Sequence, residues 1–305
     1  MTGKNLIVRI SEGLGNQMFM YANAYALSKY YNFNLLLDDT SGYFKKKDVR
    51  TYLLNNFNLS AKVVSKNFKF DNYFKNLKRK FLKNIDNLTL KKRFIIEPRD
   101  NDKVTKYEKI NCKNLSNLVY IEGHYETEKY FKQHRNNLIN EFSLKNITEL
   151  QKNKYYNFIH KNRENIISIC IRTNRFSERL GNKFRSNSIL MSDNFTKKNI
   201  AYIKRAIQNL PININNPIYL VWSNNFDGLK NYFPDKNFIF VENCENKAII
   251  DFYLLTLCKY FIVGPTSFHW WGAWLSNFNN KICIKPKDLN PSNNLDFWPS
   301  NWIPL

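Results

Sequence analysis

The sequence predicts an α/β protein built from two Rossmann-like domains, and three observations support this. The chain opens with a short apolar run, a glycine-containing turn and a helical stretch, which together form the start of an α/β unit. From residue 165 onward, strand-like apolar runs alternate with helical segments, and this alternation favours a parallel sheet covered by helices. The 305 residues suffice for two domains, which we place at 1–150 and 151–305.

In the first domain, apolar runs mark strands and helical spacing of apolar residues marks helices. The helix after the glycine turn carries Met18, Tyr21, Ala22 and Tyr25 at such spacing. The expected strands are Asn5–Ile10, Phe33–Leu37 and Val119–Glu122, and the expected helices are Asn16–Tyr30 and Glu126–Phe142.

Residues 62–109 form a Lys-rich insert that is expected to be helical. Phe70, Phe74, Leu77, Phe81 and Ile85 recur at steps of three or four residues, with basic residues between them. A basic amphipathic helix of this kind is compatible with an anionic membrane surface. Apolar stripes more often pack on their own domain, and we favour that alternative.

In the second domain, polar helical residues 146–164 come first and are expected to bridge the two domains. The expected strands are 166–172, 218–223, 238–242, 261–264 and 281–285, and the expected helices are about 195–209, 226–233, 246–259 and 267–277.

The net charge of +22 implies an anionic partner, which could be nucleic acid, an acidic membrane face or a phosphate-bearing substrate. A general bias of the composition toward Lys and Asn explains part of this net positive charge. No apolar run approaches the roughly 20 residues of a membrane span, and no secretory signal is evident. The expected location is therefore the cytoplasm. The five cysteines (Cys112, Cys170, Cys244, Cys258 and Cys283) form no CxxC pair, so neither disulfides nor a zinc site are expected.

Two glycine-containing turns could bind a ligand. Gly13-Leu14-Gly15-Asn16 lies between a strand and a helix, where bare backbone can approach a phosphate or sugar oxygen. It is not a dinucleotide fingerprint, because Met18 occupies the third glycine position. The second turn, Gly264–Ser267, precedes a helix with Thr266 or Ser267 as N-cap and is a candidate phosphate cradle.

Two charged residues stand at positions that suit a nucleotide ligand. Arg172 follows the first strand of the second domain, where it could pair with a pyrophosphate at the carboxyl edge of the sheet. Asp251 lies in an otherwise apolar helix, and its carboxylate matches the two adjacent N–H donors of guanine. An arginine facing solvent and an acidic N-cap or surface ion pair are the simpler alternatives.

Taken together, these segments resemble the α-1,2-fucosyltransferases of glycosyltransferase family 11. The resemblance covers nearly the whole chain. It rests on GLGNQMFMYANAYAL near the start, IEGHYETEKYF in the middle, VWSNN at 221–225, and DFYLLTLCKYFIVGPTSFHWWGAWL toward the end.

The resemblance implies a GT-B-like fold, in which two Rossmann-like domains face a cleft. It also implies an inverting, metal-independent transfer of L-fucose or a related deoxyhexose from a GDP-sugar to a glycan hydroxyl. The product would carry an α-1,2 linkage, and no cofactor would be needed. By position, Arg172 and Asn16 would be catalytic. The donor would be bound by the remaining site residues, namely Gly13, Gly15, Ser223, Asn224, Asp251, Thr266, Ser267 and Phe268.

One segment departs from the family pattern. The family usually has His-x-Arg-Arg-Gly-Asp where this chain has Cys170-Ile171-Arg172-Thr173-Asn174-Arg175. Only the first Arg is retained, so a catalytically inactive glycan- or nucleotide-binding relative is an alternative. A basic nucleic-acid-binding protein is a weaker one, since the aromatic residues are spaced as core. Glu122 and Glu126 are candidate general bases, and a mechanism in which GDP itself takes the proton is the alternative. The acceptor could be a lipid-linked bacterial glycan at the inner membrane face.

Overall fold

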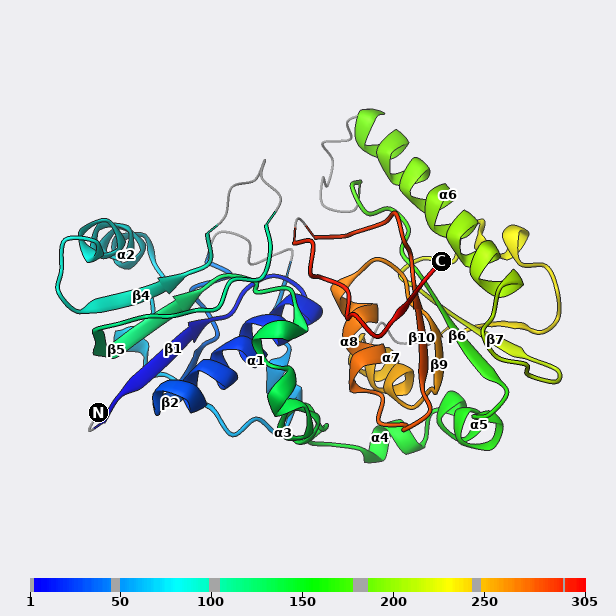
Figure 1. The fold of residues 1–305 in the computed structure, drawn as a ribbon, viewed down its shortest axis with the longest axis horizontal. Coiled ribbons are helices and arrows are strands. Elements are labelled where there is room, and N and C mark those ends of the chain that lie inside the picture. The colour runs from blue at the N-terminus through cyan, green and yellow to red at the C-terminus, as the bar shows by residue number, and fades with distance from the viewer. Residues whose placement is uncertain (1–2, 45–49, 99–104, 178–185, 243–247, 293) are drawn as a thin grey trace. The chain divides into compact units, whose positions relative to one another are not determined.

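A computed structural model describes residues 3–44, 50–98, 105–177, 186–242, 248–292 and 294–305 (Figure 1). They form two compact α/β units, Met1–Lys145 with Ser292–Pro299, and Asn146–Pro291 with Ser300–Leu305. The second unit thus differs from the predicted range 151–305, because a C-terminal segment belongs to the first unit. In that segment, the Asp296 carboxylate accepts a hydrogen bond from the Tyr107 amide (2.7 Å), and the Phe297 ring lies 6.1 Å from that of Phe19.

The first unit contains a five-stranded, all-parallel sheet in the order β3-β2-β1-β5-β4. Its central strand β1 is buried along four of its five residues, as expected where both faces of a parallel sheet are covered. Helix α1 is buried from Leu14 to Ser28 at nearly every position, so it is a core helix. The strands are β1 (Asn5–Arg9), β2 (Asn34–Asp38), β3 (Lys62–Val63), β4 (Lys92–Ile96) and β5 (Leu115–Glu122), and the helix is α1 (Leu14–Tyr31).

The segment predicted as a helical insert, 62–109, also supplies two strands, β3 and β4, and that part of the prediction is wrong. Strand β4 forms because Phe94 and Ile95 are buried against β5, where the Phe94 ring stacks on that of Tyr120 at 5.4 Å. The helix of this segment is α2 (Tyr73–Asp86), and a short 3-10 turn, η2 (Lys66–Phe68), precedes it.

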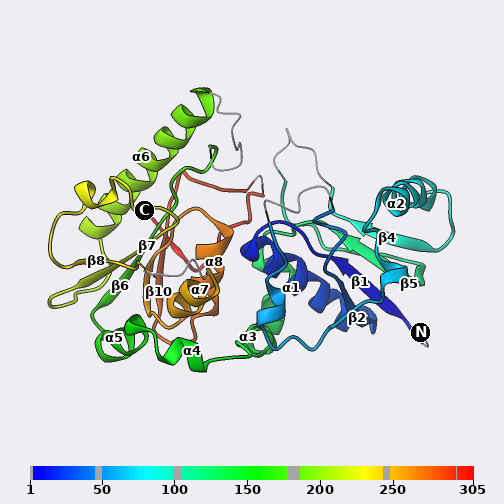
Figure 2. The same ribbon diagram turned by 180° about the vertical axis from the view of Figure 1, so that it is seen from behind.

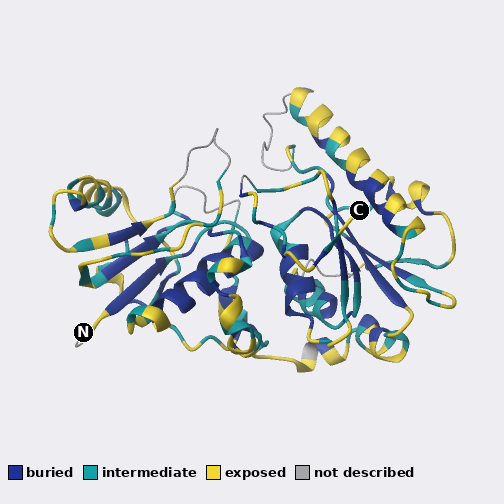
Figure 3. Ribbon diagram, in the orientation of Figure 1, coloured by how far each residue is buried: buried dark blue, intermediate teal, exposed yellow. Residues whose placement is uncertain are grey.

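The favoured packing of the whole apolar stripe on the protein's own domain is also wrong. Phe70 is buried and Ile85 is half-buried, but Phe74, Leu77 and Phe81 are exposed. Figure 3 shows this outward face of α2 beside strand β4.

The predicted helix Glu126–Phe142 is divided into three short pieces. Thr127 caps the first piece by accepting a hydrogen bond from the Lys129 amide. The pieces are η3 (Glu128–Tyr130), η4 (Lys132–His134) and α3 (Arg135–Glu141), and a further 3-10 turn, η1, spans Leu54–Asn56.

The second unit contains a six-stranded, all-parallel sheet in the order β11-β10-β9-β6-β7-β8. The alternation of strands and helices predicted from residue 165 onward is confirmed. The strands are β6 (Ile166–Ile171), β7 (Ile218–Ser223), β8 (Phe238–Phe240), β9 (Tyr260–Ile262), β10 (Ile282–Lys285) and β11 (Ile303–Pro304). The helices are α4 (Thr148–Gln151), α5 (Lys154–Asn162), α6 (Ser186–Gln208), η5 (Leu229–Tyr232), α7 (Ala248–Thr256) and α8 (Ser267–Leu275).

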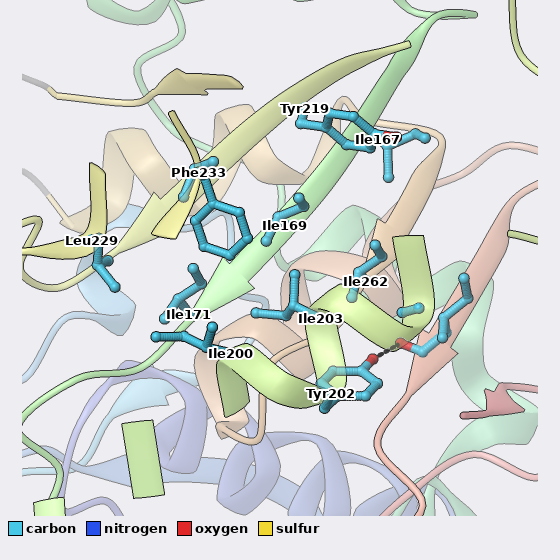
Figure 4. Close-up of a cluster of buried hydrophobic side chains, with 13 residues drawn as sticks. Ile167, Ile169, Ile171, Ile200, Tyr202, Ile203, Tyr219, Leu229, Phe233 and Ile262 are labelled. Atoms are coloured by element: carbon cyan, nitrogen blue, oxygen red, sulfur yellow. Dashed lines mark hydrogen bonds between the residues drawn. The ribbon is translucent and has the colours of Figure 1, made fainter. Parts of the chain in front are cut away.

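Helices cover both faces of this second sheet. Ile167, Ile169 and Ile171 of β6 point to the face covered by α6, because alternate residues of a strand share one face (Figure 4). On the same face, the hydroxyl of Tyr202 in α6 donates to the Ile284 carbonyl at 2.8 Å. Helices α7 and α8 lie on the opposite face (Figures 1 and 2). No helix among the described residues is both long and apolar enough to cross a membrane.

Candidate active site

Three segments meet at the carboxyl edge of the second sheet. Strands β6 and β7 run in register, with Ile171 opposite Ser223, so both strands end at the same level. Strand β9 runs parallel beside β6 and leads into the turn Gly264–Ser267 before α8. Arg172, which directly follows β6, and this turn therefore lie at the edge of the sheet where α/β proteins bind ligands.

Gly264 sets the close approach between the turn and strand β6. A Cβ atom at this position would overlap the carbonyl oxygen of Cys170 and lie 2.9 Å from Nδ1 of His269. Only glycine fits at this position. The turn therefore contacts Cys170, which lies two residues before Arg172 in the sequence. The sequence pattern had indicated a glycine turn but not the strand that it touches.

The charge of Arg172 acts on His269, which lies in the first turn of α8. Burial of the imidazole is the main cause that lowers the pKa of His269 to about 3, and the positive charge of Arg172 lowers it further. His269 is therefore neutral, and its buried Nδ1 has no hydrogen-bond partner among the described residues. Sequence reasoning missed His269, although it lies in the aromatic segment quoted above.

The start of α8 provides the second part of the candidate site. Thr266 is the N-cap, and its hydroxyl accepts a hydrogen bond from the His269 amide at 3.1 Å. Ser267 and Phe268 are half-exposed at the first helical positions. The first N–H groups of an α-helix have no partner within the helix and carry its positive dipole end, so they suit an anionic oxygen. The predicted cradle thus has the local structure that a phosphate requires.

Arg175 supports this turn instead of extending the cationic site. Its Nη1 donates to the Pro265 carbonyl at 3.0 Å, and its Nη2 donates to the Pro291 carbonyl at 2.7 Å. Its guanidinium also lies 5.0 Å from the centre of the Phe195 ring. Arg175 thereby ties the turn before α8 to the segment after β10.

The two polar residues at the end of β7, Ser223 and Asn224, mainly bind backbone of the second unit. The Asn224 side chain accepts from the Thr173 amide at 2.9 Å and donates to the Thr173 carbonyl at 3.2 Å. Ser223 donates to the Asn225 carbonyl at 2.7 Å. Asn224 therefore positions the residue next to Arg172, a role that the sequence pattern did not reveal.

Asp251 lies in the first turn of α7 and is half-buried. Its neighbour Phe252 packs edge-to-face on Phe268 of α8, with ring centres 5.4 Å apart. The same two helices approach closely at Gly272, where an added Cβ would overlap Leu255. This packing connects the helix that carries Asp251 to the helix that begins at the candidate phosphate cradle.

The predicted residues of the first unit lie at the carboxyl edge of its own sheet. Gly13 is the N-cap of α1, and its carbonyl accepts hydrogen bonds from the amides of Asn16 and Gln17. Gly15 is buried and Asn16 is half-exposed in the first turn. Arg50, which sequence reasoning missed, lies beside Gly13, and its buried Nε has no hydrogen-bond partner among the described residues.

The buried amide of Gln17 explains part of the GLGNQ pattern. Its Nε2 donates to the carbonyls of Glu12 and Thr51, both at 2.8 Å, and its Oε1 accepts from the Leu53 amide at 2.9 Å. Gln17 thus fixes the 51–53 segment against the start of α1, and its role is structural.

Of the two candidate bases, Glu122 is poorly suited to accept a proton. Both of its carboxylate oxygens accept from Nη1 of Arg79 at 2.6 Å, and Lys83 lies at 3.0 Å. Burial alone would raise the pKa of Glu122, but Arg79 and Lys83 outweigh it and the pKa is lowered. Glu126 is half-buried, and its carboxylate lies 3.8 Å from Nδ1 of His124. Within the described part of the chain, no three His, Cys, Asp or Glu side chains gather to hold a metal ion.

Comparison with known proteins gives concordant results. The family model for glycosyl transferase family 11 matches residues 2–304. The chain is 29% identical over 311 residues to the alpha-1,2-colitosyltransferase of Escherichia coli, covering 98% of each chain. It is also 29% identical over 317 residues to the O-antigen biosynthesis glycosyltransferase WbnK of Escherichia coli, covering 95% of this chain and 98% of that protein.

Solved structures share the fold at low sequence identity. Fucosyltransferase NodZ from Bradyrhizobium matches with a TM-score of 0.50 and 12% identity, over 89% of this chain and 93% of its own. A mutant of Arabidopsis thaliana FUT1 in complex with GDP matches with a TM-score of 0.53 and 14% identity, over 93% and 71% respectively. These likenesses confirm the expected GT-B type of fold. With a family match that spans nearly every residue, this chain belongs to glycosyl transferase family 11 and is a glycosyltransferase.

Proposed function

We propose that this protein moves L-fucose, or a related deoxyhexose, from a GDP-sugar to a hydroxyl of a bacterial surface glycan with inversion, forming an α-1,2 linkage. The observation that carries the proposal is the close approach of Gly264 to Cys170, which brings the segment that carries Arg172 and the turn before α8 together at one edge of the second sheet. The two Escherichia coli relatives support a bacterial glycan acceptor and a deoxyhexose donor, because one is named for O-antigen biosynthesis and the other for colitose.

The proposed step is a displacement at the anomeric carbon of the donor sugar. The acceptor oxygen forms a bond to that carbon while the bond to the β-phosphate oxygen breaks, and the proton of the acceptor hydroxyl passes to the departing GDP. Negative charge then builds on the departing GDP. Arg172 and the N–H groups at the start of α8 would stabilise that charge, so the proposal requires no metal ion.

Donor recognition is tested first by thermal shift with GDP, UDP, CMP and dTDP sugars. We expect stabilisation by the GDP compounds alone. Transfer is then measured with GDP-fucose and GDP-colitose, with and without EDTA, by following GDP release and the glycosylated product. Turnover that EDTA abolishes would overturn the metal-independent mechanism. GDP-sugar binding with neither transfer nor hydrolysis would show an inactive relative.

The role of Arg172 is tested by Arg172→Ala. We expect a loss of roughly 10²–10³-fold in transfer, as for removal of one charge-stabilising donor at a reacting centre. Arg205→Ala is the matched control, because Arg205 is exposed on α6 of the same unit. Near-normal turnover by a folded Arg172→Ala protein would exclude the assigned role.

A further inference from the structure

Helix α2 is attached to the first sheet largely through its polar residues. Arg79 and Lys83 bind the carboxylate of Glu122 at the end of β5. Asp86, which is buried, accepts hydrogen bonds from the Arg93 amide at 2.8 Å and the Phe94 amide at 3.3 Å. Leu82 also packs on the buried cluster of this sheet, and Ile85 is half-buried. The inner face of this amphipathic helix is nevertheless mainly polar, the reverse of the usual arrangement in a water-soluble protein.

The apolar face of α2 consequently points to solvent. The exposed fractions are 62% for Tyr73, 80% for Phe74, 44% for Leu77 and 63% for Phe81. At roughly 100° per residue these four side chains occupy one arc of the helix. Leu88 and Leu90, which follow the helix in the sequence, are also exposed, by 86% and 91%.

Basic residues border this apolar arc. Lys78 and Lys80 are both exposed, and the helical geometry places them on opposite sides of the arc. Lys91 and Arg93 are exposed beside the two leucines. The exposed side chains of α2 include no acidic residue, because Asp86, the one acid in the helix, is buried. The charge surrounding the apolar arc therefore complements an anionic surface.

We propose that α2 lies in the plane of an anionic lipid bilayer and attaches the enzyme to it. The aromatic and leucine side chains would enter the boundary between headgroups and acyl chains, and the flanking lysines would contact lipid phosphates. Membrane attachment through α2 does not depend on the proposed donor or acceptor. A surface that bound a protein partner through apolar contact would not require the exposed lysines, Lys78 and Lys80, on the two sides of the apolar arc.

The experiment is vesicle flotation of the full chain with phosphatidylcholine alone and with added phosphatidylglycerol. We expect binding to the anionic vesicles that falls as salt is raised. Phe74→Ser with Phe81→Ser should lower partitioning roughly tenfold or more per ring. Lys78→Gln with Lys80→Gln should lower it about fivefold per charge.

Matched controls come from exposed residues of α6. Leu190→Ser with Met191→Ser repeats the loss of two exposed apolar side chains, and Lys197→Gln with Lys198→Gln repeats the loss of two charges. Both controls should float like the unmodified protein. Urea unfolding should be unchanged in all four variants, because every substituted side chain is exposed.

Three outcomes would overturn the proposal. The unmodified protein could fail to bind anionic vesicles, or the α2 variants could bind them as well as the unmodified chain does. The α6 controls could also lose as much binding as the α2 variants. Light scattering tests the alternative that a second copy of the chain binds to the apolar face of α2. Self-association that Phe74→Ser with Phe81→Ser abolishes, without any vesicle binding, would identify α2 as a contact between copies of the chain and refute the membrane proposal.

Discussion

The imidazole of His269 should make the stability of this protein depend on pH below neutrality. Burial, with a further contribution from Arg172, lowers its pKa from 6.5 to about 3. In the unfolded chain the group regains its ordinary pKa, so between these two values the unfolded state binds the additional proton. The free energy of unfolding therefore falls as the pH falls through this window, and the full contribution is present above about pH 6.5.

The expected slope is about 1.4 kcal/mol per pH unit within the window, or about 2 kcal/mol between pH 6.5 and pH 5. Urea unfolding of the unmodified chain and of His269→Gln across this range isolates the effect, because the other titrating groups are common to both proteins. The stability of His269→Gln should fall less steeply. Arg172→Gln should leave the slope in this range unchanged and end the fall at a higher pH, since it removes only the smaller of the two causes of the lowered pKa. Parallel stability curves for the unmodified chain and His269→Gln would refute the burial of a neutral His269.

Two further substitutions test the packing and the ion pairs. Gly272→Ala should destabilise the fold by about 1–3 kcal/mol in urea unfolding, because the new Cβ overlaps Leu255, and Leu255→Ala in the same chain should recover part of the loss. An unchanged midpoint would contradict the close approach of α7 and α8. Glu122→Gln should destabilise by about 3 kcal/mol, since it leaves Arg79 and Lys83 without their carboxylate, and adding Arg79→Met should restore stability. Retained transfer in the folded Glu122→Gln protein would also show that this carboxylate is not the base, whereas a selective loss of turnover would contradict the structural role.

The sequence predicted the parallel sheets and the position of the donor-side candidates for one physical reason. Apolar runs bounded by turns identify strands, and the carboxyl ends of parallel strands meet at one edge. Arg172 and the Gly264–Ser267 turn both follow such strands. Their common location was therefore predictable, although Arg172 and Gly264 are 92 residues apart in the chain. Strand β4 was not predictable from the sequence, because its apolar part is only Phe94 to Ile96 within a lysine-rich segment. Pairing with β5 stabilises this strand.

What the tertiary structure alone decided is the direction of side chains and the partners that they meet. Periodicity located the apolar stripe of α2, but only the contact of Arg79 with Glu122 turned that stripe outward. The same is true of Arg175, whose guanidinium binds two carbonyls distant in sequence. A linear pattern encodes spacing along one element, whereas the energy of a charged or aromatic side chain depends on groups from other elements. The amino-acid sequence by itself therefore determined which segments form the sheets and where their ends lie, and the packing of those segments decided what each charged residue does.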